Sequence, residues 1–343
     1  MIITRTPFRI SFFGGGTDYP AWYKKNGGAV LSTTINRYGY ITCRFRAPFF
    51  EHKYKMTYSK IEETNNYNKI DHPSIRESLK FLNMKDGISV VYDTDLPARS
   101  GLGSSSTFTV GLLNALYGLK GELKTKRQLA IDAIHVEQNL IKENVGSQDQ
   151  TAAAFGGFNR IEFGGANEIT VYPLTVSQDR LTDLQNHLMI FFTGFSRTAS
   201  EIAAEQVQLI NQKNNELTAM KQMVYEAQDI LYRKNGNLDD FGHLLDKSWQ
   251  LKRTLSPQIS NPTLDKIYKA GRDAGALGGK LLGAGGGGFI LFFARPKYQP
   301  RIREKLKKYL HVPFNFENSG SQVIYYSPHD HFNGESKIYE KNT

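Results

Sequence analysis

The chain has 343 residues, of which 40% are hydrophobic and 22% charged, a composition that excludes disordered, collagen-like and coiled-coil proteins. Its length exceeds that of one ordinary domain, so two domains are expected. Its 43 lysines and arginines against 33 aspartates and glutamates give a net charge of +10, which favours nucleic acid, acidic membranes or phosphorylated small molecules as partners.

Three further features narrow the class of protein. The longest apolar stretches, at 188–192 and 289–294, are far shorter than the roughly 20 residues of a membrane-spanning helix. Cys43 is the single cysteine, so neither an intrachain disulfide nor a thiolate metal cluster can form. The N-terminal residues also lack the apolar region of a signal peptide. We therefore expect a cytoplasmic protein without a membrane-embedded segment.

Patterns in the first half of the chain predict strands with helices between them. Alternating hydrophobic residues at 41–46 and again at 54–58 indicate an antiparallel strand pair with one solvent-exposed face. A third strand is expected at 88–93, followed by a loop rich in glycine and serine at 95–106. Helices are expected at 107–119 and 126–142.

The pattern changes near residue 185, where a buried strand is expected at 187–195. Further helices are expected at 198–233, 238–254, 263–274 and 298–309, and strands at 289–294, after a glycine-rich turn, and at 320–328. Because no repeat or proline-rich linker marks a boundary, the change of pattern alone divides the chain. We expect one domain at 1–183, a second at 184–332 and a frayed tail at 333–343.

The strongest local signal for chemistry is the loop that precedes the helix at 107–119. Glycines let a backbone approach a phosphate, and the unpaired N–H groups and dipole of a helix N-terminus favour an anion. The loop matches neither the dinucleotide fingerprint nor the Walker A loop. A serine-capped helix after a flexible turn is the alternative. The candidate phosphate-binding residues are Pro97, Ser100, Gly101, Leu102, Gly103, Ser104, Ser105 and Ser106.

Glu137 stands out in the predicted helix at 126–142. Its spacing places it on the apolar face, with Ala133 and Ile141. A glutamate is rarely buried unless it is paired, and metal coordination is one way to pair it. The alternative is an ion pair at the rim of this face. Glu137 is therefore a candidate metal ligand.

Asp149 lies in a loop after Gly146, where a carboxylate can be held beside a substrate hydroxyl and accept its proton. It is equally well placed to cap the helix that follows. Two other segments, Arg9 with the loop 14–18 and the glycine run at 283–288, allow a ligand or another strand to approach the backbone closely. Ordinary turn geometry explains both segments as well.

The order of these segments is more specific than any one of them. An N-terminal P-x-R-I…G-x-x-T-D, a central P-x-x-x-G-L-G-S-S-S and a late G-A-G-G-G-G-F resemble the three motifs of the GHMP small-molecule kinases. The resemblance extends from residue 3 to about residue 327. It implies an α+β fold of two domains, a ribosomal-protein-S5 domain 2-like N-terminal domain and a ferredoxin-like C-terminal domain, with ATP and sugar in the cleft between them.

The resemblance also implies roles for individual residues. The segment 101–106 matches the loop that binds the ATP phosphates, and Ser105 and Glu137 match the residues that bind Mg²⁺. Asp149 matches the proposed catalytic base, and Arg9 matches the basic residue that pairs with it. The expected cofactors are therefore ATP and Mg²⁺.

The same resemblance suggests a substrate. Galactokinases carry Glu-His where this chain has Gly15-Gly16, which removes two side chains that hold galactose and leaves space for a larger sugar. Within the family, the sequence is most similar to the kinases that phosphorylate D-glycero-D-manno-heptose 7-phosphate at its anomeric hydroxyl, in GDP-heptose synthesis for surface polysaccharide. The candidate substrate-binding residues are Gly15, Gly16, Thr17, Asp18, Asp149, Gly285, Gly286 and Gly287, with Arg197 as the candidate for the 7-phosphate.

Two alternatives remain. Another sugar 1-kinase of the family, acting on L-fucose or a uronic acid, would carry the same motifs. S5-like domains also occur in RNA-associated proteins, and the basic run at 301–308 lies beside Tyr309, although a solvated helix face explains that run more simply. We expect a sugar phosphate and ATP as ligands, no nucleic-acid or membrane partner, and we leave open whether the chain forms a homodimer.

Overall fold

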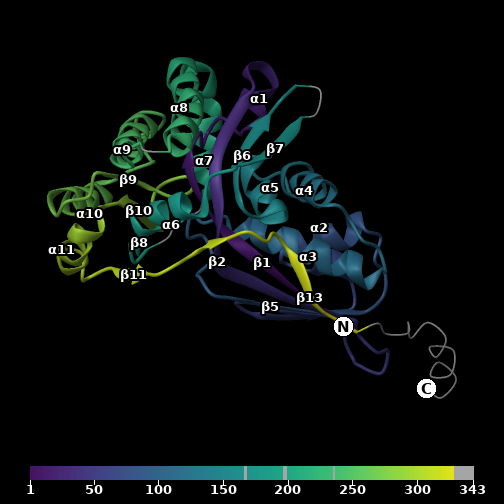
Figure 1. The fold of residues 1–343 in the computed structure, drawn as a ribbon. Coiled ribbons are helices and arrows are strands. Elements are labelled where there is room, and N and C mark those ends of the chain that lie inside the picture. Colours follow the sequence, from purple (N-terminus) through teal and green to yellow (C-terminus); the bar gives the residue numbers. More distant parts are fainter. Residues whose placement is uncertain (166–167, 196–198, 235, 328–343) are drawn as a thin grey trace, which may run out of the picture.

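The computed structural model describes residues 1–165, 168–195, 199–234 and 236–327, and their strands form two sheets (Figure 1). A nine-stranded sheet lies in the part of the molecule that holds both ends of the described chain. A four-stranded sheet lies in the other part, among helices from the second half of the sequence. No helix in the described residues is long and apolar enough to cross a membrane.

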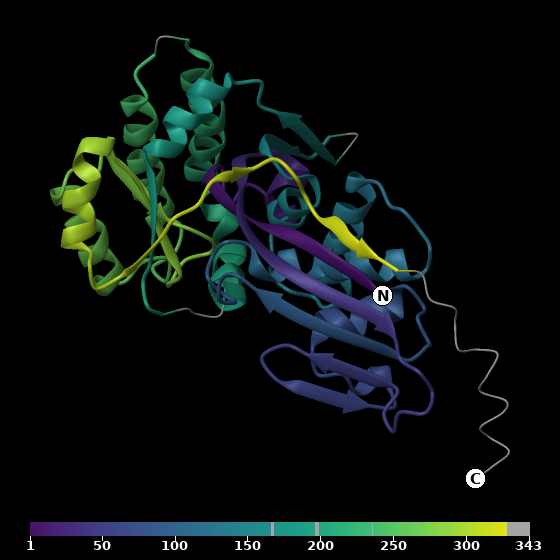
Figure 2. The same ribbon diagram turned by 60° about the horizontal axis from the view of Figure 1, so that its bottom comes forward.

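Two long antiparallel strands, β1 (Ile2–Phe13) and β2 (Gly28–Phe45), form the centre of the larger sheet. The short helix α1 (Pro20–Asn26) lies between them in the sequence. β2 also pairs with β5 (Ile88–Thr94) through its second half and with β6 (Phe158–Phe163) through its first half. Figure 2 shows β1, β2 and β5 side by side.

The strand pairing in this region differs from the prediction. The segments at 41–46 and 54–58 do not form a pair, because β5 lies between β2 and β3 (Tyr54–Thr57). β3 runs parallel to β5, and β4 (Ile61–Thr64) forms the outer edge. The physical reason is burial: β5 begins with three consecutive buried residues, whereas β3 alternates, so β5 gains more from a position inside the sheet.

One face of the larger sheet is covered by helices. The helix α3 (Ser104–Leu119) packs directly on β1 and β2, and most of its residues are buried, which explains its nearly continuous apolar sequence. The expected helix at 126–142 is α4 (Lys126–Ile134) followed by a π-helical turn, η2 (His135–Leu140). The other elements of this part are η1 (Tyr67–Lys69), α2 (Pro73–Phe81), α5 (Gln148–Phe155) and β7 (Ile169–Pro173).

The smaller sheet is antiparallel, and its strand order is β11-β8-β10-β9. Its central strands, β8 and β10, are almost fully buried, as the apolar runs of the sequence predict. Its strands are β8 (Leu188–Phe192), β9 (Gly278–Leu281), β10 (Phe289–Phe293) and β11 (Leu310–Val312). The surrounding helices are α6 (Gln178–Asn186), α7 (Ala199–Leu209), α8 (Asn214–Tyr232), α9 (Asp239–Arg253), α10 (Pro262–Asp273) and α11 (Gln299–Lys305), with η3 (Ile210–Gln212) and η4 (Pro296–Tyr298).

The single long helix expected at 198–233 is in fact broken. The turn η3 and the non-helical Lys213 separate α7 from α8. The break falls in the sequence NQKNN, and asparagine has a low helix propensity. The separated α8 is free to pack on α9 and against β1 and β2 of the larger sheet.

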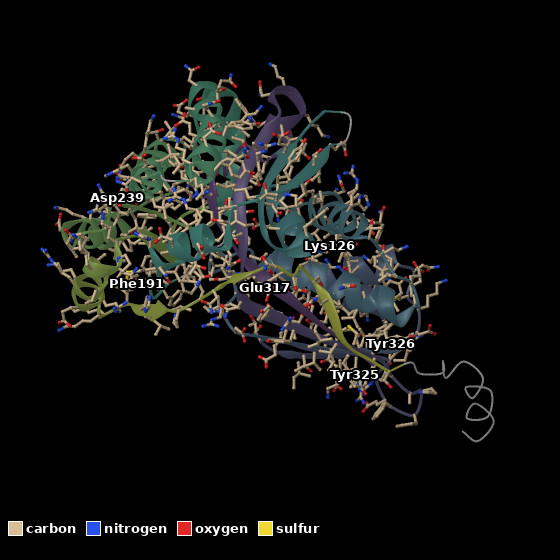
Figure 3. All side chains as sticks on the ribbon, in the orientation of Figure 1. Lys126, Phe191, Asp239, Glu317, Tyr325 and Tyr326 are labelled. Atoms are coloured by element: carbon tan, nitrogen blue, oxygen red, sulfur yellow. The ribbon has the colours of Figure 1, made fainter. Side chains whose placement is uncertain are left out.

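The last described strands return to the larger sheet. β12 (Phe316–Glu317) pairs with β2, and β13 (Gln322–Tyr326) pairs with β1 along its outer edge. Figure 3 shows Glu317 where the chain reaches the larger sheet, and Tyr325 and Tyr326 near its end. The second domain, expected at 184–332, includes β12 and β13. Their pairing joins both strands to the larger sheet, most of which lies in the first expected domain. The tail expected at 333–343 lies outside the described residues.

One histidine is packed between aromatic rings under this sheet. His72 stacks on Phe108 with the ring centroids 4.5 Å apart, and its ring meets that of Tyr58 edge-on. Burial lowers the pKa of His72 to about 4. Its Nδ1 has no hydrogen-bond partner among the described residues. The folded protein therefore resists protonation of this ring.

We expect His72 to make the protein sensitive to acid. The unfolded chain protonates histidine near pH 6.5 and the folded chain near pH 4, so the free energy of unfolding should fall as the pH drops between these values. The loss from His72 between pH 7.5 and pH 5 is about 2 kcal/mol. His72→Phe keeps an aromatic ring without the titration. Urea unfolding at both pH values should show a smaller loss for this variant, and equal losses would contradict the assignment.

Candidate active site

A cavity of about 160 Å³ lies where β1, the start of α3 and the start of α5 meet α7, α9 and β9. Its walls come from both parts of the molecule, so residues far apart in the sequence face each other across it. The charged residues of its lining are Arg9, Asp18, Arg99, Asp149, Lys252 and Lys280. This lining contains four cations and two carboxylates, a balance that favours an anionic ligand.

The predicted phosphate loop forms one wall of this cavity. The helix α3 begins at Ser104, and its N-cap is Gly103, in a left-handed conformation and without a side-chain cap. The structure therefore shows no serine-capped helix; the Ser104 hydroxyl instead accepts a hydrogen bond from the Arg99 N–H at 3.0 Å. The uncapped first turn of α3 presents its backbone N–H groups to the cavity, as anion binding requires.

The eight residues predicted for this loop have different positions. Those that line the cavity are Gly101, Gly103, Ser104, Ser105 and Ser106. Ser100 and Leu102 are buried behind them, and their carbonyls accept hydrogen bonds from Phe289 and Arg9. Pro97 is exposed and is not part of the lining.

The glycine run of the C-terminal part packs against the phosphate loop. A Cβ on Gly101 would lie 2.3 Å from the Leu282 carbonyl oxygen, and one on Gly288 would lie 2.2 Å from that of Ser100. Both residues also have positive φ, so glycine is required for space and for conformation. The two backbones are therefore in direct contact, which fixes the C-terminal part against the phosphate loop.

The third motif reaches the cavity with residues other than those predicted to bind substrate. Gly283 and Ala284 line the cavity, whereas Gly285, Gly286 and Gly287 are not among the lining residues. Gly285 and Gly286 pack against Ile259, and Gly287 packs against Phe195. These three glycines are buried next to the cavity wall. A substrate-binding role for them stays a prediction.

Arg9 and Asp149 meet in the cavity as the sequence predicts. The Arg9 Nε and Nη2 donate to the two carboxylate oxygens of Asp149, each at 2.8 Å, and Nη1 donates to the Gly101 carbonyl at 2.7 Å. Asp149 lies in the first turn of α5, but its carboxylate is bound to Arg9 and does not cap that helix. Each carboxylate oxygen keeps a free lone pair. Asp149 can therefore still accept a proton from a ligand hydroxyl.

The loop before α1 places a second carboxylate beside the first. Asp18 is buried, and it accepts hydrogen bonds from the Gly16 N–H at 2.9 Å and the Gln148 N–H at 3.4 Å. Burial raises its pKa, and the neighbouring Asp149 acts in the same direction. Gly15 and Gly16 line the cavity next to it. The Thr17 hydroxyl lies within hydrogen-bond distance of the Gly14 carbonyl of this loop and the Ala29 carbonyl of β2. Thr17 therefore ties the loop to β2, and it is not part of the lining.

Glu137 is fully buried, as its position on the apolar face predicts. It lies in the π-helical turn, and its Oε2 accepts hydrogen bonds from the Ser106 hydroxyl at 2.8 Å and from the Gln150 side chain. Its Oε1 has no hydrogen-bond partner among the described residues. Burial raises the pKa of Glu137 to about 7. A hydrogen bond from the Thr109 side chain acts against this rise in pKa. Among the described residues no ion pair at the rim holds this carboxylate, and a cation at Oε1 would add a partner.

Among the described residues, no contact supports the prediction that Ser105 binds a metal ion. Ser106, one residue later, is the serine that reaches Glu137, and Ser105 is exposed on the cavity lining. A metal role for Ser105 stays a prediction. Within the described ranges, no group of three or more histidine, cysteine, aspartate or glutamate side chains is placed to hold a metal ion. Arg197, the candidate for the 7-phosphate, lies outside the described residues.

Two lysines that line the cavity, Lys252 and Lys280, were not predicted from the sequence. Lys252 is 5% exposed and donates to the Gly283 carbonyl; Lys280 is 2% exposed and donates to the Phe12 carbonyl at 2.8 Å. Burial lowers the pKa of both ammonium groups, that of Lys252 to about 8. A signal for Lys252 was present: it follows Trp249 and Ser248 by three and four residues on the buried face of α9. Helical spacing identified Glu137 in the same way.

Two family models match this sequence. One is the GHMP kinases N terminal domain, over residues 73–157, and the other is the GHMP kinases C terminal, over residues 223–312. A D-glycero-alpha-D-manno-heptose 7-phosphate kinase from Campylobacter jejuni is 33% identical over 324 residues, which cover 90% of this chain and 93% of that protein.

Solved structures with the same fold include two bacterial sugar kinases. A putative sugar kinase from Campylobacter jejuni superposes with a TM-score of 0.72 at 30% identity, and the match covers 94% of this chain and 97% of the other. A D-glycero-D-manno-heptose 1-phosphate kinase from Bacteriodes thetaiotaomicron gives a TM-score of 0.77 at 22% identity, covering 95% and 100%. The fold is shared along nearly the whole length of each chain.

Proposed function

The chain belongs to the GHMP kinase family, and we propose that it transfers the γ-phosphoryl group of ATP to the anomeric hydroxyl of D-glycero-D-manno-heptose 7-phosphate. Membership of the family makes it an ATP-dependent sugar kinase with the expected two-domain α+β fold. The named sugar phosphate rests on the 33% identity to the heptose 7-phosphate kinase. The site observation that carries the proposal is the Arg9–Asp149 pair beside the uncapped start of α3.

The arrangement supports in-line transfer between two subsites. The N–H groups at the start of α3 and the serines of its first turn would hold the ATP phosphates. Asp18 would bind sugar hydroxyls on the other side of Asp149. The transition state of phosphoryl transfer is largely dissociative, so positioning and charge neutralisation supply most of the rate enhancement. The cavity lining supplies residues both for positioning and for charge neutralisation.

Asp149 would accept the proton of the attacking hydroxyl. Arg9 holds both of its oxygens and is itself fixed by the Gly101 carbonyl, so the carboxylate has one orientation. That carbonyl belongs to the phosphate loop. Donor phosphate, base and sugar subsite are therefore positioned by one continuous set of contacts.

The space beside Asp18 supports a sugar larger than galactose. Gly15 and Gly16 line the cavity, and a Cβ on Gly15 would meet no heavy atom closer than 3.7 Å, which is the distance to the Gln148 side-chain nitrogen. A larger side chain at Gly15 would point at Gln148 and Ser11 of the cavity lining. A Cβ on Gly16 would instead point at Leu217. Gly15 therefore leaves this part of the cavity to the substrate.

Glu137 and Ser106 are the residues that would hold Mg²⁺ in this proposal. Magnesium needs only one or two protein carboxylates when substrate phosphates supply further ligands, and the unpartnered Oε1 of Glu137 fits that requirement. The ion would neutralise charge on the phosphate oxygens of ATP. Ser105, on the same turn of α3, is the ligand that the motif itself implies.

Glu137→Gln should raise the Mg²⁺ concentration needed for half-maximal rate by at least about tenfold, because the amide supplies a weaker ligand than the carboxylate. The measurement is the kinase rate against free Mg²⁺ at saturating ATP. Glu304→Gln is the matched control, since Glu304 is an exposed glutamate of α11 outside the cavity lining. An unchanged Mg²⁺ dependence in Glu137→Gln would exclude the ligand role.

A substrate panel tests the choice of sugar. The purified protein is incubated with ATP and Mg²⁺ and with D-glycero-D-manno-heptose 7-phosphate, sedoheptulose 7-phosphate, mannose 6-phosphate, galactose or L-fucose. ADP release is followed, and phosphorus NMR identifies the product. A new anomeric phosphate on the heptose 7-phosphate alone is the expected result. Turnover of an unphosphorylated sugar would keep the kinase assignment and reject the heptose 7-phosphate.

A further inference from the structure

Two buried lysines of the C-terminal part face the cavity, and the mechanism above does not use them. Lys252 comes from α9 and Lys280 from β9, and both are at least nine-tenths buried. An ammonium group has three donors, yet each lysine has one hydrogen bond among the described residues, to a backbone carbonyl. Buried cations with spare donors indicate that the site is completed by an anion.

The carboxylates of the cavity do not balance these lysines. Asp149 is bound on both oxygens by Arg9, which leaves Asp18 as the remaining carboxylate of the described lining. Asp18 accepts two backbone hydrogen bonds, and no ion pair to either lysine is present among the described residues. Two buried amino groups therefore face the cavity with at most one carboxylate to oppose them, and the oxygens of a phosphoryl group have the chemistry to accept their hydrogen bonds.

Contacts connect Lys252 to the phosphate loop and, through it, to the base. Its Nζ donates to the Gly283 carbonyl, and Gly283 touches Gly101, where a Cβ on Gly283 would lie 2.5 Å from the Gly101 Cα. The Gly101 carbonyl accepts from Arg9, which in turn holds Asp149. Lys252 and Asp149 line the same cavity and interact electrostatically. A phosphoryl group that passes from the loop to a hydroxyl at Asp149 therefore crosses the cavity that Lys252 lines.

We propose that Lys252 is a catalytic residue whose ammonium group binds the phosphoryl group during its transfer from ATP to the sugar. The bond from the γ-phosphorus to the ADP oxygen breaks, the bond to the sugar oxygen forms, and the hydroxyl proton passes to Asp149. Lys252 stays protonated and donates hydrogen bonds to the non-bridging oxygens, on which charge is spread in the transition state. Lys280 places a second amino group on the same cavity lining, from β9, where it donates to the Phe12 carbonyl.

This inference rests on the kinase assignment and not on which sugar is phosphorylated. The test therefore uses whichever sugar phosphate the wild-type enzyme accepts, together with the same sugar without its own phosphate. If the wild type phosphorylates no heptose 7-phosphate, the substrate proposal fails, and the test of Lys252 proceeds with the sugar that it does phosphorylate.

Lys252→Met is the informative variant, because methionine fills the space and removes the charge. We expect kcat to fall about 10²–10³-fold with both sugars, while the KM for ATP and for the sugar changes less than threefold. Lys252→Arg should recover part of the rate. Lys247→Met, on the exposed face of the same helix, is the matched control and should keep the wild-type kcat.

Binding of a non-hydrolysable ATP analogue and the thermal unfolding temperature show whether Lys252→Met is folded. In a folded variant, three outcomes would overturn the proposal. One is a kcat within threefold of the wild type. Another is a loss confined to the phosphorylated sugar, which would assign Lys252 to the substrate's own phosphate. The third is an equal fall in Lys247→Met. If Lys252→Met does not fold, Lys252→Gln, which also removes the charge, is measured by the same kcat criterion.

Discussion

Asp149→Asn should reduce kcat by about 10²–10⁴-fold while the affinity for ATP stays nearly the same. The amide cannot accept the proton of the sugar hydroxyl, and its NH₂ group would face a donor of Arg9, where the carboxylate accepts two hydrogen bonds at 2.8 Å. The ATP subsite at the start of α3 does not include this carboxylate. The measurements are steady-state kinetics and equilibrium binding of an ATP analogue.

The matched control for this variant is Asp179→Asn, an exposed aspartate in the first turn of α6. It removes the same charge from the same position in a helix and should leave kcat unchanged. A fall of less than about tenfold in Asp149→Asn would mean that Asp149 is not the base. A large loss of ATP affinity would mean that the Arg9–Asp149 pair acts by shaping the phosphate loop.

Gly288→Ala should destabilise the protein by about 3 kcal/mol or more, which lowers the unfolding temperature by roughly 4 °C or more. The new methyl group would lie 2.2 Å from the Ser100 carbonyl oxygen, at a residue with φ of +105°. Relief of this clash requires the C-terminal strand to move away from the phosphate loop. We therefore also expect weaker ATP binding, which calorimetry can measure together with thermal unfolding.

Gly121→Ala is the control that separates the effect of backbone strain from the effect of the steric clash. Gly121 also has a positive φ, of +72°, but a Cβ there would meet no atom within 4 Å. It should cost only the conformational strain, about 1 kcal/mol, and leave ATP binding intact. Equal effects of the two variants would show that the contact between the glycine run and the phosphate loop has no special importance.

Much of the site could be predicted because its parts are local in the sequence. The phosphate loop sits directly before a helix, and the helical period alone placed Glu137 on a buried face, where the structure has it. The pairing of Arg9 with Asp149 joins residues 140 positions apart. A local sequence pattern cannot predict a contact over that separation. The pairing was predicted from the resemblance to a known family.

The features that were predicted wrongly or were not predicted depend on contacts between segments that lie far apart in the sequence. β5 enters between β2 and β3 because its buried residues need neighbours on both sides, which the alternation of β3 alone does not reveal. Lys252 and Lys280 become cavity residues only when the two parts of the molecule meet. Ser106 reaches Glu137 because of the rotation of α3 against η2, which the spacing within α3 does not reveal. The periodicity of a sequence shows which residues of one helix or strand share a face. It does not show how two such elements are rotated against each other.

The pairing of the last described strand with the first has a consequence for protein synthesis. β1 needs β13 as its outer neighbour, but β13 begins 309 residues after Phe13, the last residue of β1. At roughly 5–20 residues per second, a ribosome needs about 15–60 s to add this stretch. During that time the outer edge of β1 is an open template for pairing with other chains. A nascent chain stalled before Gln322 should therefore depend on chaperones that shield strand edges.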